Sequence, residues 1–112
     1  MKIKNYEAAA LSRTLAGIDL QDAKTESEII VDLFITLLPA TKEYDSALAT
    51  LQKEAQGKSP EEVKNLVSAQ AFDKIANDVS DIDFGLTIDQ IKAIGKHFKS
   101  VADIALLYNL KK

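Results

Sequence analysis

The feature that most constrains the fold is a long, mostly apolar stripe in the middle of the chain. Its members recur at alternating intervals of four and three residues: Ile30, Phe34, Leu37, Thr41, Tyr44, Leu48, Leu51 and Ala55. This spacing keeps them on one face of a helix for about seven turns. Pro39 lies inside the stripe, removes one backbone donor and is expected to kink the helix. Two helices that meet at Pro39 are the alternative, but one kinked helix is favoured because the stripe keeps its phase across the proline.

Capping signals mark where this helix and its return begin and end. Thr25, followed three residues later by Glu28, predicts a capping box at the start of the long helix, and Gly57 predicts its end. Residues 59–62 (Ser-Pro-Glu-Glu) predict a second helix with proline at its first position. A change of apolar phase around Ser68 predicts a bend in that second helix. Together the two form a long helical hairpin.

Two further helices flank the hairpin. Asn5 suits an N-cap for a first helix that ends near Gly17. Thr87 with Gln90 forms a capping box for a last helix. Gly95 inside this helix costs about 1 kcal/mol relative to Ala, and the close approach of another helix would explain it. The stripe of the last helix consists of Ile91, Ile94, Phe98, Val101, Ala105 and Tyr108.

Two short segments alternate polar and apolar residues, which is typical of half-buried strands. They are residues 1–4 and 81–86, and they predict a small two-stranded β element that needs helical cover to be stable. The chain of 112 residues suits one domain. We therefore expect a mainly α fold in which residues 1–112 form a single helix-rich domain.

Composition excludes several classes of function. The chain has no Cys and only one His, so it lacks a disulfide framework, a thiolate nucleophile and a zinc–thiolate site. Its 14 Lys and Arg against 17 Asp and Glu give a net charge of −3, which argues against a dedicated nucleic-acid binder. Residues 33–41, an uncharged stretch, have about half the length that a bilayer requires, and no signal-peptide core follows Lys2 and Lys4. We expect a cytoplasmic protein with no membrane segment, metal, cofactor or small-molecule substrate.

The single histidine and the acidic residues match no catalytic motif. His97 has no partner supplied by a motif and is expected at the surface or at the boundary of the core. Aligning the calcium-loop pattern on Gly85 places apolar residues at ligand positions, so an EF-hand is excluded. An enzyme that uses Asp81, Asp83 and His97 together remains a hypothesis, and it requires these side chains to converge in a pocket.

The long stripe favours a binding function. A helix of about 30 residues spans about 45 Å, which is longer than a compact domain of this size is wide. Part of the stripe is therefore expected to project past the core and to contact a protein partner or a second copy. The candidate interaction face consists of Tyr44, Leu48, Leu51 and Ala55. This favours a non-enzymatic protein-interaction or accessory protein.

A small regulator, antitoxin-like or repressor-modulating, is the alternative function. It would contact nucleic acid through the last helix and the end of the chain, where basic residues gather. These are Lys92, Lys96, Lys99, Lys111 and Lys112.

One order of motifs covers most of the chain. It begins with residues 1–5 (Met-Lys-Ile-Lys-Asn) and an Ala- and Leu-rich first helix, continues through the helix with Tyr44 to Ala55, and reaches Asp81–Phe84 just before Leu86 and Thr87. This order resembles a family of short, uncharacterised phage and prophage proteins. The resemblance implies a long helical hairpin with a small β element, and a role in phage assembly or host interaction. The chain departs from the family at Pro39 and in the extended helix after Thr87, and the family provides no catalytic residues to carry over.

Overall fold

A computed structural model describes all residues from Met1 to Lys112. The predicted class is confirmed: the fold is mainly α, with a long helical hairpin and one two-stranded antiparallel sheet. The elements in chain order are β1 (Lys2–Lys4), α1 (Asn5–Ala16), α2 (Ser27–Ala55), α3 (Pro60–Lys64), α4 (Val67–Asn77), β2 (Val79–Asp81), α5 (Ile88–Gly95), α6 (Val101–Leu107) and the 3-10 turn η1 (Tyr108–Leu110).

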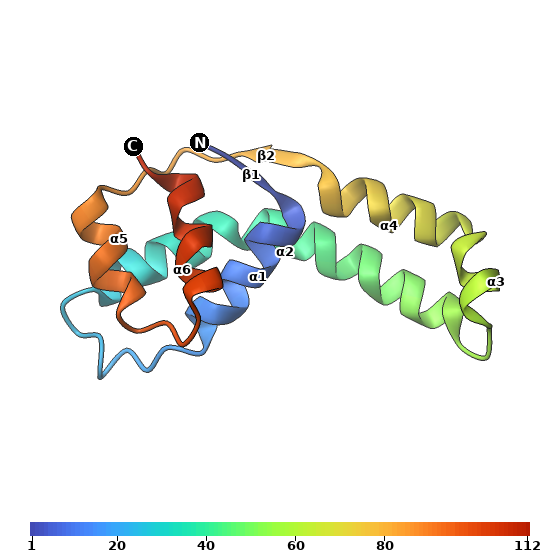
Figure 1. Ribbon diagram of the computed structural model, residues 1–112, viewed down its shortest axis with the longest axis horizontal. Coiled ribbons are helices and arrows are strands. Elements are labelled where there is room, and N and C mark those ends of the chain that lie inside the picture. Colours follow the sequence, from blue (N-terminus) through green and yellow to red (C-terminus); the bar gives the residue numbers. More distant parts are fainter.

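Helix α2 is the spine of the molecule (Figure 1). Its 29 residues give a length of about 43 Å at 1.5 Å per residue, close to the longest dimension of 48 Å. Helices α1, α5 and α6 gather around its N-terminal half and form a body, whereas α3 and α4 return along its C-terminal half and form an arm (Figure 1). The other two dimensions are only 26 and 22 Å, so the molecule is elongated along α2.

The hydrophobic core lies in the body. Helix α2 contributes Ile30, Leu33, Leu37 and Ala40, and no residue of α2 beyond Thr41 is buried. Each fully buried Leu or Ile is worth about 1.5–3 kcal/mol relative to an exposed one, so most of the stability comes from this end. The body adds Leu11, Leu15, Leu86, Ile91, Ile94, Leu107 and Leu110 from the other elements.

Helix α2 runs without interruption through Pro39, so the preference for one helix over two is confirmed. Proline has no N–H to donate to the Ile35 carbonyl. Pro39 and Ile35 are both exposed, so water can reach the free carbonyl. No helix in the structure combines the length and the apolar character needed to cross a bilayer.

Asn5 has a different role from the predicted N-cap. Lys4 occupies the N-cap position, and Asn5 is the first residue of α1. The Asn5 side chain is buried, donates from Nδ2 to the Ile75 carbonyl (2.9 Å) and accepts at Oδ1 from Ser80 Oγ (2.6 Å). The prediction was wrong because this asparagine joins the start of α1 to the end of α4 and to β2.

The sheet pairs the predicted segments with different bounds. Strand β2 is Val79–Asp81 rather than residues 81–86, and Ile3 lies opposite Ser80. The Ile82 N–H still donates to the Met1 carbonyl (2.7 Å), but the chain then runs past the end of β1. Beyond this point only Leu86 is bridged, and its partner is Lys111.

The capping box predicted at Thr25 and Glu28 is absent. Helix α2 begins at Ser27, and Glu26 at its N-cap makes no side-chain capping bond. The Glu26 carboxylate is instead engaged by Lys96 and His97, so a tertiary contact replaces the local one.

The second helix of the hairpin begins as predicted but is divided into two helices, α3 and α4. Gly57 has a φ of +75°, a left-handed conformation that glycine adopts without strain, just after α2 ends. The Glu62 N–H donates to Ser59 Oγ (3.3 Å), so the capping box of α3 is confirmed. The bend expected around Ser68 is a complete break between α3 and α4 at Asn65 and Leu66.

The last helix is two helices rather than one. Thr87 caps α5 as predicted, because Thr87 Oγ1 accepts from the Gln90 N–H (3.2 Å). Helix α5 ends at Gly95, and α6 folds back so that a Cβ on Gly95 would lie 3.4 Å from Ile104 Cγ2. The close helix approach expected at Gly95 is confirmed, but this fold-back ends the predicted continuous stripe and leaves Val101 82% exposed.

Candidate functional site

The predicted interaction face lies between α2 and α4, inside the arm. Its members are half-buried, and α4 packs along this half of α2 (Figure 1). The Tyr44 ring lies 5.2 Å from the Phe72 ring of α4, and the Arg13 guanidinium lies 5.6 Å from the Tyr44 ring centre. The same guanidinium pairs with Asp45 at 2.7 Å. The face from Tyr44 through Leu48 and Leu51 to Ala55 therefore forms the inner side of a two-helix hairpin.

A more exposed apolar stripe lies on the opposite side of α2. Val31 is 40% exposed, Ile35 is 58% exposed and Leu38 is half-buried. Their spacing of four and three residues places them on one side of the helix, and we call these three residues the outer α2 face. The sequence analysis did not predict this face, although the four- and three-residue intervals between its members are a signal of a helix face. The inner stripe is longer, and spacing alone does not show which apolar side of the helix is covered.

An apolar pocket adjoins the outer α2 face. Its volume is about 170 Å³, and every residue that lines it is apolar. It is smaller than the 300–1,000 Å³ typical of ligand pockets, so its size suits one or two apolar side chains. The lining residues are Leu15, Ala16, Ile18, Leu20, Ile30, Val31 and Phe34.

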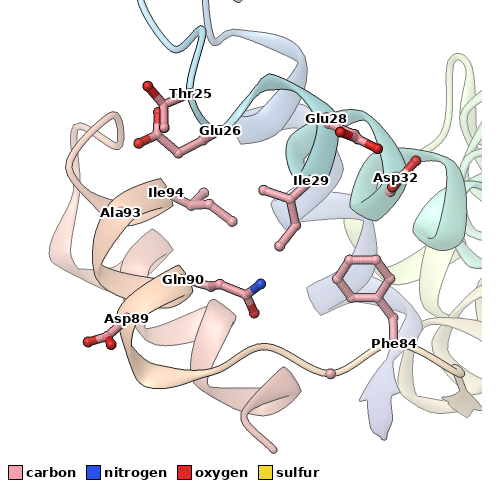
Figure 2. Close-up of a pocket in the computed structure, with 11 residues that line it drawn as sticks. Thr25, Glu26, Glu28, Ile29, Asp32, Phe84, Asp89, Gln90, Ala93 and Ile94 are labelled. Carbon is pink, nitrogen blue, oxygen red and sulfur yellow. The ribbon is translucent and has the colours of Figure 1, made fainter.

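A larger cleft separates the first turns of α2 from α5 (Figure 2). Its volume is about 600 Å³, and Ile29, Phe84 and Ile94 point into it. Glu28 and Asp32 lie side by side along its α2 edge (Figure 2). The lining residues include four carboxylates and no Lys, Arg or His, although one of the four, Glu26, is paired with Lys96. The structure contains no group of three or more His, Cys, Asp or Glu side chains that could hold a metal ion.

His97 has a partner that the sequence did not reveal. Its Nε2 lies 3.2 Å from Glu26 Oε2, and Lys96 Nζ lies 3.4 Å from Glu26 Oε1. The His97 side chain is only 16% exposed, so the expected boundary position is confirmed. The hydrogen bond with His97 lowers the pKa of Glu26 below its ordinary value of 4.5; burial opposes this effect, and Lys96 reinforces it. The cluster ties the start of α2 to the end of α5.

The three residues of the enzyme hypothesis do not meet in a hydrogen-bonded group. Asp81 lies 3.4 Å from the N-terminal amine, whereas His97 pairs with Glu26. No hydrogen bond or ion pair joins Asp81 or Asp83 to His97. Asp81 and His97 therefore have different partners, and the Asp83 side chain pairs with neither.

The basic residues at the end of the chain do not share one helix. Lys92 lies on α5, Lys96 and Lys99 lie between α5 and α6, and Lys111 and Lys112 follow η1. Lys96 is also paired with Glu26. The single basic helix expected for a nucleic-acid contact is therefore replaced by separate lysines on several elements.

The contacts of Glu26 predict a pH-dependent contribution to stability. Glu26→Gln is expected to lower the free energy of unfolding at about pH 7 and to have little effect at about pH 3. A carboxyl whose pKa is lowered by folding stabilises the protein above its unfolded-state pKa, and this stabilisation is lost as the pH falls through its folded-state pKa. Urea unfolding across this range measures the difference. Glu54→Gln, at an exposed site, is the control and should change little at any pH. A Glu26→Gln effect that is constant with pH would contradict this assignment.

The fold and its surfaces together define a small helical protein with an apolar pocket, an acidic cleft and an exposed apolar helix face. Comparison with protein-family models, with curated proteins and with solved structures gave no match. The resemblance to short phage and prophage proteins therefore stays a prediction.

Proposed function

We propose that the chain is a non-enzymatic protein-interaction protein whose contact surface is the outer α2 face with the adjoining apolar pocket. The observation that supports this proposal most strongly is the exposure of Val31 and Ile35 beside a pocket lined only by apolar side chains. Exposed apolar side chains that adjoin one another gain from removal of water, at about 25 cal/mol per Å² buried. The pocket supplies a site where a partner can insert an apolar side chain.

This contact surface lies on a different side and in the other half of α2 from the face formed by Tyr44, Leu48, Leu51 and Ala55. The inner face already packs against α4, whereas no element of the chain covers Ile35, which is 58% exposed. Ile35 also lies on a regular helix in the body, so a partner meets a rigid surface without an ordering cost. A cytoplasmic location and an accessory role in phage assembly or host interaction stay predictions, and the identity of the partner would decide the latter.

Photo-cross-linking from Ile35 tests this function. A photoreactive residue placed at Ile35 is expected to give a discrete adduct, both with the purified protein and in cells that naturally encode it. The same residue placed at Val101 is the matched control, because Val101 is an 82% exposed apolar residue outside the proposed surface. Equal labelling from both positions, or no adduct from Ile35 in either setting, would overturn the proposal.

A further inference from the structure

The outer α2 face has opposite charges at its two ends. Glu28 lies seven residues before Ile35, and Lys42 lies seven residues after it. Seven residues are close to two helical turns, so all three side chains lie on the same side of α2. Glu28 and Lys42 are exposed, and neither has an ion-pair partner within the chain. The face is thus an apolar centre with one unpaired acid and one unpaired base at equal distances from it.

We propose that this face binds a second copy of the chain, with the two α2 helices antiparallel about a two-fold axis near Ile35. The inference rests on the proposed function and names its partner. In this arrangement Glu28 of each copy lies opposite Lys42 of the other, which gives two ion pairs by symmetry. A parallel pairing would place Glu28 beside Glu28 and Lys42 beside Lys42. The charge pattern therefore selects the antiparallel orientation.

The apolar part of the surface is also self-complementary. The two-fold axis brings Ile35 of each copy together, and Val31 and Leu38 of one helix meet the reversed order of the same residues on the other. Val31 also lines the apolar pocket, so the outer α2 face and the pocket form one continuous surface. Asp32, next to Glu28 in the acidic cleft, adds negative charge near the partner's Lys42.

Charge reversal tests both the partner and its orientation. Glu28→Lys and Lys42→Glu each replace two attractive pairs by two repulsive ones, and each is expected to weaken self-association by about tenfold. The double variant Glu28→Lys/Lys42→Glu restores both pairs with reversed sign and is expected to regain wild-type association. Sedimentation velocity over a concentration series gives the dissociation constant of each protein. Both sites are exposed, and far-UV circular dichroism checks that every variant folds.

Glu54→Lys and Lys58→Glu are the charge-matched controls, because both residues are exposed and lie at the tip of the arm. They should leave self-association unchanged. A wild-type chain that stays monomeric at every concentration would overturn the second copy as the partner. Single variants that associate as well as the wild type, or a double variant that is not restored, would overturn the antiparallel pairing. Cross-linking from Ile35 then judges the proposed function separately, because it reports adducts of any mass.

Discussion

Leu37→Ala is expected to lower the free energy of unfolding by about 2–5 kcal/mol, the range for removing a buried leucine from a packed core. Leu37 is fully buried in the core cluster, in the N-terminal half of α2. The substitution removes methyl and methylene groups from the core and leaves a cavity that rigid helices on several sides cannot close. The Leu37 backbone carbonyl also accepts a hydrogen bond from the buried Thr41 Oγ1 (2.9 Å), so this turn of the helix has little freedom to shift.

Urea unfolding at one protein concentration measures this change, because self-association would make stability depend on concentration. Val101→Ala, which also shortens an apolar residue, is the control at an 82% exposed site and should change the free energy by less than about 0.5 kcal/mol. Equal effects at the two positions would show that the core does not lie where the structure places it.

Pro39→Ala is expected to raise the free energy of unfolding by up to about 3 kcal/mol, the difference between Pro and Ala in a helix interior. An alanine at this position supplies the N–H that the Ile35 carbonyl lacks and removes the clash of the proline ring with that turn. Pro39 is exposed and is not a member of the core, so little packing is lost. The melting temperature and the urea midpoint should therefore both increase.

Pro60→Ala is the matched control for this gain. Pro60 is at the first position of α3, where no intrahelical N–H bond exists to be recovered. There the proline restricts the unfolded chain at no cost to the helix, so its removal should lower the free energy of unfolding by roughly 0.4–1 kcal/mol. A loss of stability in both variants would show that the packing of α1 and α4 requires the local geometry at Pro39.

The features that sequence predicted correctly are those set by local chemistry. The apolar stripe of α2 keeps the same helical phase on both sides of Pro39, and it correctly predicted one helix there. The capping boxes at Ser59 and Thr87 correctly predicted the starts of α3 and α5. Alternation of polar and apolar residues predicted the small sheet and its first strand, although only Asp81 of the segment 81–86 lies in β2. Each of these signals depends on residues within a few positions of one another, so the sequence alone is sufficient to predict these features.

The features that sequence missed depend on distant residues. Thr25 does not cap α2, because the helix begins at Ser27 and its N-cap is Glu26, whose carboxylate contacts Lys96 and His97 just after the end of α5. The last helix breaks, and α6 folds back so that Ile104 packs on Gly95. The outer α2 face was missed for a related reason. Helix α2 has apolar residues on two sides, and spacing alone does not show which side α1 and α4 cover.

We propose that Ile35 lies at the centre of a contact surface that no part of the chain covers. Cross-linking of the purified protein from Ile35, followed by mass spectrometry, tests it most directly. We expect an adduct of twice the 12.3 kDa chain mass whose cross-links map to α2 of the second copy, and no such adduct from Val101. Cross-links from Ile35 to residues of the same chain only would rule out this contact surface, because they would show that the chain itself covers this face.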